Sequence, residues 1–370
     1  MEYWDVASAD PQQQVGARHH TVPAFYIRGF ANPQDQVWVR DRRRPEPGLS
    51  KVTDLAVRDF YTFTNVDGQS DGRFEQLLEK VETAAAPALK RLRSAVVWNA
   101  PLSAEDRDEI ITFVAFQMAR GPRKRREIEL QADLLARLET INPPARLTNK
   151  TLAEYRNQQK LWQGMEIFSD PGEHMKIIGS LAAQLARHLH ARPMTALMLT
   201  ESALLSCDEP VLLMQPERAP GPLLPDPPAP RLGSRRRKGV RTPRRRNQLI
   251  QVQSTAGGIL TAEQILLPLG RRTILAFGPP GPQADVDTNI QLTAEESREA
   301  AAEVNARVLS RAYFSAFCHP DDRALLDAPL PEVGPLLRVG GAHDEHKAVV
   351  AAVPRQLQPQ VHGRRRSNRK

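Results

Sequence analysis

The sequence predicts an α+β fold in which a mainly antiparallel sheet packs against a lobe of helices. Short strand-like segments come first, amphipathic helices occupy the middle, and strands return before a final helix. This order lacks the regular strand–helix alternation of parallel α/β folds. It favours the early strands joining the later ones in one sheet. We therefore expect residues 18–320 to form a single intertwined domain.

The first strands are predicted where apolar residues cluster or alternate between turn residues. Residues 24–30 and 36–41 (QVWVRD) have strand character, and Asn32-Pro33 supplies a turn between them. Residues 59–64 (DFYTFT) are a third short strand candidate.

Helices are predicted from residue 73 to about residue 190. Residues 73–93 place apolar side chains at helical spacing, and Pro87 should bend or split that helix. Ser103 with Asp106 resembles the capping motif of a second helix that runs to Arg120. Further helices are expected at residues 123–140, 151–165 and 173–190.

The hydrophobic period then changes to that of short buried strands. These are predicted at residues 195–200, 203–207, 211–214, 249–253, 265–269 and 273–277. Thr293 and Glu296 form a capping box that opens a last helix, which we expect to end near Phe317.

Positive charge is concentrated in two short segments. The 370 residues include 51 Lys and Arg and 43 Asp and Glu, for a formal net charge of +8. Thirteen of the basic residues lie in residues 234–246 (SRRRKGVRTPRRR) and 363–370 (GRRRSNRK), which contain no acid. The rest of the chain has 38 basic and 43 acidic residues and is mildly acidic. A domain that grips nucleic acid usually spreads its basic residues over a folded face instead.

The first basic segment follows a proline tract that can form neither helix nor ladder, because residues 216–230 contain seven prolines. We expect residues 215–247 to be a disordered insertion, 321–354 a partly ordered extension and 355–370 a disordered basic tail.

These segments could bind RNA, DNA or another polyanion weakly and nonspecifically by contacts to phosphates. Neither contains an aromatic residue, so base stacking is not available there. The alternative is a solvated insertion with no specific partner. The candidate nucleic-acid-binding residues are Arg235, Arg236, Arg237, Lys238, Arg244, Arg245 and Arg246.

Familiar catalytic signatures are absent, including GxxxxGK[ST], GxGxxG, HExxH, GxSxG and CxxC. The two cysteines, Cys207 and Cys318, cannot staple a chain of this length, and we expect reduced thiols in a cytoplasmic protein. The chain shows no secretion signal and no apolar run long enough for a membrane span. No cofactor or metal can be assigned.

A few polar residues are candidates for a functional site. Gln117 and Arg120 share one face of an otherwise apolar helix, and a buried guanidinium requires an anionic or carbonyl partner. They could bind a substrate, or form a structural ion pair with Glu79, Glu82 or Asp208. Asp208, in a turn between apolar strands, could bind a metal, act as a base or cap the turn.

Two basic features near the chain start and middle are also ambiguous. His20 could be a base or ligand, or could hydrogen-bond a turn. Residues 123–126 (RKRR) open a helix, where the helix dipole disfavours cations. This position is a mild hint of an anionic partner, and solvated side chains are the alternative.

Four segments together resemble a bacterial group, domain-of-unknown-function family 4238. They are residues 20–30 (HTVPAFYIRGF), 116–122 (FQMARGP), 206–211 (SCDEPV) and 265–269 (ILLPL). Thr21 replaces the usual aromatic residue, and Cys207 interrupts the Ser-Asp pair. The resemblance spans about residues 18–317 and implies no activity. It directs attention to His20, Gln117, Arg120 and Asp208. Arg28 is a further candidate for substrate binding.

The sequence thus predicts a protein that acts on or binds a phosphate-bearing substrate such as nucleic acid. His20 would move protons, and Asp208 would orient His20 or hold a divalent metal. Arg120, with Gln117 and Arg28, would bind the substrate. The alternative is a non-enzymatic interaction or scaffold protein whose polar motif residues form a buried structural network. The oligomeric state cannot be predicted.

Overall fold

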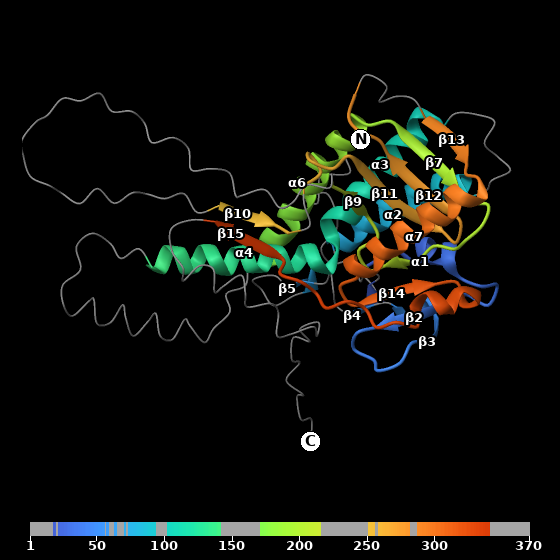
Figure 1. Cartoon of the computed structure of the whole chain (residues 1–370). Coiled ribbons are helices and arrows are strands. Elements are labelled where there is room, and N and C mark those ends of the chain that lie inside the picture. Colours follow the sequence, from blue (N-terminus) through green and yellow to red (C-terminus); the bar gives the residue numbers. More distant parts are fainter. Residues whose placement is uncertain are drawn as a thin grey trace, which may run out of the picture.

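The computed structural model confirms the α+β fold (Figure 1). It describes residues 18–19, 21–55, 57–58, 63–64, 70–71, 73–93, 102–141, 171–215, 251–255, 258–281 and 287–340. The predicted helix at 151–165, residues 216–247 of the predicted insertion and the basic tail lie outside the described residues.

A five-stranded sheet forms the centre of the molecule. Its strands are, in spatial order, β13 (Asp287–Gln291), β7 (Met194–Met198), β12 (Thr273–Phe277), β11 (Gln264–Gly270) and β9 (Leu212–Met214). β13 runs parallel to β7, and the other neighbours are antiparallel. β11 and β12 are buried along nearly their whole length, in keeping with their continuous apolar sequences.

A second, four-stranded antiparallel sheet joins early and late segments of the chain. Its order is β3 (Gly48–Lys51), β2 (Gln36–Asp41), β14 (Ser315–Cys318) and β8 (Ser206–Cys207). Early and late strands therefore pair as expected, although the strands divide between two sheets rather than forming one.

The helices match the hydrophobic pattern. α3 (Ala104–Arg120) is buried on most sides and packs against α2 (Arg73–Arg93) and α6 (Pro171–His190). Ser103 caps α3 by accepting a hydrogen bond from Asp106 N at 3.0 Å. α7 (Ala294–Arg311) begins at the predicted capping box and lies against β8 and β9. α2 continues through Pro87 without splitting.

Two element predictions were wrong. Residues 24–30 form a helical turn, α1 (Ala24–Ile27) with the 3-10 helix η2 (Arg28–Phe30), because Pro23 O accepts hydrogen bonds from Tyr26 N and Ile27 N. The last helix ends at Arg311 rather than near Phe317, because β14 takes a central place between β2 and β8.

A further group of elements consists of α4 (Pro122–Ile141) and a two-stranded ladder. The strands β10 (Gln251–Ser254) and β15 (Leu337–Gly340) form a separate antiparallel ladder that lies along α4 in Figure 1. A small apolar cluster of Tyr313, Phe314, Leu336 and Leu337 supports this ladder. We call α4, β10 and β15 together the arm.

The remaining elements are short. They are β1 (Arg18–His19) paired with β4 (Val57–Arg58), β5 (Phe63–Thr64) paired with β6 (Ser70–Asp71), and the 3-10 helices η3 (Val52–Leu55) and η4 (Pro320–Leu326). Among the described helices, none combines the length and apolarity that a membrane span requires.

Candidate functional site

The first, third and fourth motif segments meet at the buried Tyr26. Its hydroxyl lies 3.0 Å from Ser206 Oγ and donates to Pro268 O. Burial raises the pKa of this phenol, so it stays neutral. The backbone of Gly29 runs so close to β11 that a Cβ there would lie 2.4 Å from Leu269 O, and a glycine is therefore required. These motif residues hold α1 against β11 and β8.

Arg93 closes the same contact from α2. Its guanidinium donates to three backbone carbonyls, Leu269 O at 2.6 Å, Phe25 O at 3.0 Å and Tyr26 O at 3.2 Å. Burial lowers the pKa of Arg93 to about 10, and the guanidinium remains charged at neutral pH. Carbonyl dipoles here replace the anionic partner that a buried cation would otherwise need.

Gln117 and Arg120, in the second motif segment, do lie together. Arg120 is 1% exposed, and its Nη1 donates to Glu82 Oε1 at 2.6 Å. With the amide oxygen of Gln117 turned toward it, Arg120 also donates from Nε at 3.0 Å and from Nη2. Burial raises the pKa of Glu82, and the nearby Arg120 opposes that rise. Glu82 was one of the ion-pair partners that the sequence allowed.

Glu209, beside Asp208 in the third motif segment, caps the start of α4. It is 3% exposed, and its Oε1 accepts a hydrogen bond from Arg123 N at 2.6 Å. A Cβ at Gly121 would lie 2.3 Å from this carboxylate, so the glycine leaves room for it. Burial raises the pKa of Glu209, while Arg311 and Arg123 oppose the rise. A carboxylate at a helix N-terminus satisfies free N–H groups and complements the dipole.

Asp208 also accepts hydrogen bonds from backbone N–H groups, but these groups belong to the segment before β14. Its two oxygens accept hydrogen bonds from Tyr313 N at 2.8 Å and Phe314 N at 2.6 Å. Burial and the neighbouring Glu209 raise the pKa of Asp208 to about 7, against the opposing effect of its backbone donors. Because Tyr313 and Phe314 belong to the apolar cluster under β15, Asp208 positions the base of the arm.

Two hydrogen bonds then attach the ladder to α4. Ser254 Oγ donates to Glu127 Oε1 at 2.8 Å, and Arg123 Nη2 donates to Thr255 Oγ1 at 3.1 Å. Glu127 is 1% exposed and also accepts from Lys124. The basic start of α4 is thus matched within the chain by Glu127, Glu129 and Glu209. The basic start of this helix suggested an anionic partner, and these acids provide one within the chain.

We call Tyr26, Arg120, Ser206, Asp208 and Glu209, with their partners, the motif joint. Through it, the segment 206–211 connects the core to the arm: Ser206 faces the core, while Asp208 and Glu209 face the arm. Ser206 and Glu209 were not selected from the sequence as site residues. Their membership of the same motif segment as Asp208 was the available signal.

The other candidate residues lie elsewhere. Arg28 is on the surface, where its Nε donates to Asp35 Oδ1 at 3.0 Å and its side chain is 52% exposed. His20 and the seven candidate nucleic-acid-binding residues between Arg235 and Arg246 lie outside the described residues. The structure therefore brings Gln117 and Arg120 together, and it places Arg28 in a different, solvated environment.

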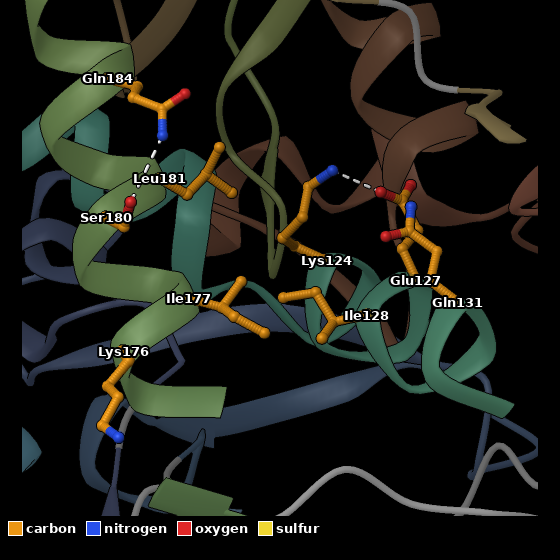
Figure 2. Close-up of a pocket in the computed structure, with 9 residues that line it drawn as sticks. All are labelled: Lys124, Glu127, Ile128, Gln131, Lys176, Ile177, Ser180, Leu181 and Gln184. Carbon is orange, nitrogen blue, oxygen red and sulfur yellow. Dashed lines mark hydrogen bonds and ion pairs between the residues drawn. The ribbon is translucent and has the colours of Figure 1, made fainter. Parts of the chain in front are cut away.

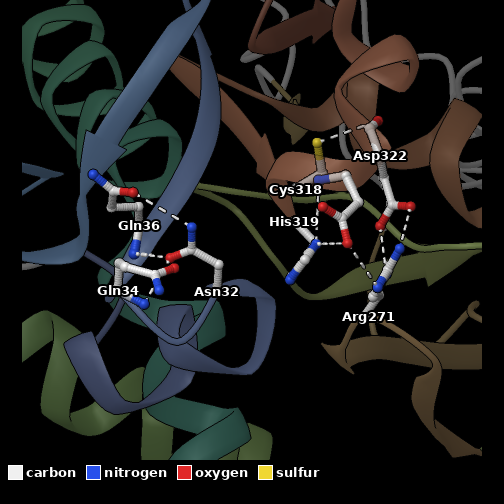
Figure 3. Close-up of polar contacts among 8 residues, drawn as sticks. Asn32, Gln34, Gln36, Arg271, Cys318, His319 and Asp322 are labelled. Carbon is white, nitrogen blue, oxygen red and sulfur yellow. Dashed lines mark hydrogen bonds and ion pairs between the residues drawn. The ribbon is translucent and has the colours of Figure 1, made fainter.

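A second polar cluster lies at the end of β14 (Figure 3). Arg271 forms a two-bond ion pair with Asp322, at 2.7 Å and 2.8 Å, and His319 Nδ1 accepts from Asp321 N at 3.2 Å. These contacts tie the β11–β12 turn to η4. Figure 3 also shows Asn32, whose Oδ1 accepts from Gln34 N and Gln36 N in the turn before β2. Each contact stabilises a turn or a helix start.

Both cysteines are free and buried. Burial raises the pKa of the Cys318 thiol to about 12, and it raises that of Cys207 as well. A thiol of such a pKa is not a thiolate at neutral pH and is a poor nucleophile. Among the described residues, no group of three His, Cys, Asp or Glu side chains could hold a metal ion.

A protein-family model agrees with the motif resemblance over its first three segments, while residues 265–269 lie beyond the match. The model described as "Protein of unknown function (DUF4238)" matches residues 18–225, which is more than half of the chain. The match includes α1 to β9 and ends before β10. No curated protein and no solved structure matches the chain significantly.

Proposed function

Because the chain belongs to the DUF4238 family of unknown function, we propose a function from its own geometry: weak, sequence-independent binding of a polyanion such as nucleic acid at the arm. In this proposal the motif joint is architectural. It fixes the start of α4 and the base of the ladder, and the two basic segments supply the affinity.

The observation that carries the proposal is the register of the β10–β15 ladder. Gln251 pairs with Gly340, so the residues before β10 and after β15 leave the ladder at the same end. The basic segment 234–246 ends a few residues before Gln251, and the chain continues from Gly340 toward the basic segment 363–370. Paired residues in an antiparallel ladder lie only about 5 Å apart. The two basic segments are therefore tethered to one point.

Such tethering raises the affinity for a long anion. Once one basic segment is bound, the other meets the same polyanion at a high effective concentration. The full chain therefore binds the polyanion more tightly than either segment would alone. Both segments lack aromatic residues, so the contacts go to phosphates and release counterions. This predicts little preference for base sequence and a steep dependence on salt.

The proposed architectural role of Gln117, Arg120 and Asp208 rests on their contacts. Arg120 and Asp208 are at least 95% buried and hydrogen-bonded within the chain. A substrate would have to displace these internal partners. Arg28 is exposed and could add a phosphate contact, but its pairing with Asp35 is an ordinary surface ion pair.

The binding experiment uses the full chain and a labelled nucleic acid of about 20 nucleotides, single-stranded or duplex, over a range of salt concentrations. In one variant all eight basic residues of 234–246 are replaced by Gln, in a second the five of 363–370 are, and a third combines both. We expect each single variant to weaken binding and the third to abolish it. A matched control replaces the exposed Arg298 and Arg307 by Gln. Undiminished binding by the third variant would refute the proposal.

A second candidate function is proton transfer by His20 and Asp208, which the raised pKa of Asp208 favours. A pKa near 7 suits a general acid or base at neutral pH. A proton-transfer residue can usually be replaced without loss of stability, so His20→Ala should then leave the melting temperature within about 2 °C of wild type. A large fall in melting temperature would identify His20 as architectural instead.

A further inference from the structure

The turn between β2 and β3 carries an excess of positive charge on the folded body. Residues 40–47 (RDRRRPEP) contain four arginines and two acids, for a formal charge of +2. Of the acids, Asp41 is bound by Arg43, and Glu46 is exposed. The chain outside the two basic segments is, by contrast, mildly acidic. We call residues 40–47 the basic turn.

Arg44 is the cation of the basic turn that is available to a ligand. Its backbone N donates to Asp41 O at 3.0 Å, which fixes its place in the turn. Its side chain is exposed and forms no hydrogen bond or ion pair with the residues that the structure describes. Pro45 and Pro47 follow it and restrict the backbone. A restricted backbone loses little conformational freedom when this arginine meets a phosphate.

Two neighbouring arginines keep their charge without a carboxylate in contact among the described residues. Arg40 donates to two backbone carbonyls at the end of η4, at 3.1 Å and 2.6 Å. Arg42 donates to three backbone carbonyls at distances between 3.0 and 3.3 Å, while Asp208 and Glu332 attract it at longer range. Carbonyl groups hold a guanidinium in place but do not cancel its charge. Both arginines therefore add to the positive potential around Arg44.

The basic turn lies against the base of the arm. Arg43 forms a two-bond ion pair with Asp41, and its guanidinium lies 5.0 Å from the centroid of the Phe314 ring. Phe314 packs with Leu337 of β15 in the apolar cluster under the ladder. From Leu337 to Gly340, where the ladder ends, the strand rises only about 10 Å. A duplex of 20 base pairs is about 70 Å long, so it can reach both the basic segments and the turn.

The groove between α4 and α6 is a less suitable surface for a polyanion (Figure 2). Its floor is aliphatic, with Ile128 from α4 facing Ile177 from α6. The ammonium group of Lys124 at its rim is already bound by Glu127. This groove therefore gives phosphates less to bind than the basic turn does.

We propose that the basic turn contacts phosphates of the same polyanion that the two basic segments bind. Arg44 contacts a phosphate directly, while Arg40 and Arg42 raise the local potential. This inference rests on the proposed function and adds to it a surface of the folded body. The bound polyanion then lies along the base of the arm.

Titration of the full chain with the labelled nucleic acid, over a range of salt concentrations, tests this inference with Arg44→Glu. The side chain of Arg44 has no contacts to lose, so the variant should keep the melting temperature of wild type. We expect binding to weaken about fivefold at low salt. The slope of log Kd against log salt should fall by about one, because one phosphate contact is lost. Arg44→Lys keeps the charge and should bind within about twofold of wild type.

The matched control is Arg187→Glu, which makes the same change of charge at an exposed arginine of α6. In Figure 1, α6 and β3 lie well apart. Equal binding by Arg44→Glu and Arg187→Glu, or equal losses in Arg44→Glu and Arg44→Lys, would overturn the inference and leave the proposed function intact. Undiminished binding by the variant that lacks both basic segments would instead refute the proposed function.

Discussion

The motif joint and the arm use charged residues in opposite ways. In the motif joint, single charges are buried and each is bound by groups from distant parts of the chain, as Glu209 is by Arg123 N. In the arm, charges are numerous, partly buried and paired mainly between neighbours of one helix, as Arg125 and Arg126 are with Glu129. The first arrangement joins distant segments of the chain, whereas the second stabilises one helix.

The family match follows the same division. It covers α4 and the five named residues of the motif joint, but it ends before the ladder and before the partners Pro268, Tyr313 and Phe314. Within the match, Ser206 contacts the core, while Asp208 and Glu209 contact the base of the arm. The basic segments that we propose for polyanion binding lie outside the match.

The largest effect on stability is expected from Glu209→Ala. The change leaves Arg123 N without its hydrogen-bond acceptor. It also removes the negative charge that attracts the guanidinium of Arg311. Breaking a buried charge pair from one side usually costs about 3 kcal/mol or more. Urea denaturation should show this loss for Glu209→Ala. It should show less than about 0.5 kcal/mol for Glu201→Ala, whose pair with Arg298 is exposed. Similar losses of unfolding free energy in the two variants would contradict the contrast between buried and exposed charges.

A double-mutant cycle on Arg120 and Glu82 tests whether this pair is structural. Arg120→Met and Glu82→Gln are made singly and together, and their unfolding free energies are compared. Because Arg120 Nη1 and Glu82 Oε1 are 2.6 Å apart, we expect a coupling of about 1–2 kcal/mol. A coupling free energy near zero, with both single variants as stable as wild type, would instead indicate that Arg120 serves to bind a substrate.

An effect that depends on pH is expected at Asp208. Its pKa is about 7 in the fold, against 3.8 as the ordinary value. A raised acid pKa means that the folded state holds a proton that the unfolded chain releases. The resulting stabilisation is complete below about pH 4 and is lost as the pH rises through 7. The shift of about three units corresponds to at most about 4 kcal/mol.

Asp208→Asn keeps the shape of the side chain and removes the titration. The stability of wild type relative to this variant should therefore fall between pH 5 and pH 8, as measured by urea denaturation. A constant difference over that interval would mean that the two backbone donors, Tyr313 N and Phe314 N, hold Asp208 ionised in the fold.

Much of the fold was predictable from local signals. The cap at Ser103, the capping box at Thr293 and the apolar stripe of α2 each correspond to a helix at the expected place. The turn at residues 24–30 was misread as a strand because a short apolar run has no distinguishable period, and the hydrogen bonds to Pro23 O decide its conformation.

The site was only partly predictable. The i, i+3 spacing of Gln117 and Arg120 correctly placed them together, and their burial follows from the apolar helix around them. The role of Asp208 was not deducible, because its partners Tyr313 and Phe314 are about a hundred residues away in the sequence. The choice between substrate binding and architecture depends on such distant contacts.

One measurement compares the two regions directly: titration of a labelled nucleic acid with wild type, with Arg120→Met, and with the variant that lacks the eight basic residues of 234–246. It is made at a temperature where circular dichroism shows all three to be folded. We predict that Arg120→Met binds within about twofold of wild type, while the basic-segment variant loses about tenfold or more at low salt. Loss of binding in Arg120→Met, with retention in the basic-segment variant, would contradict this account and place the site at the motif joint.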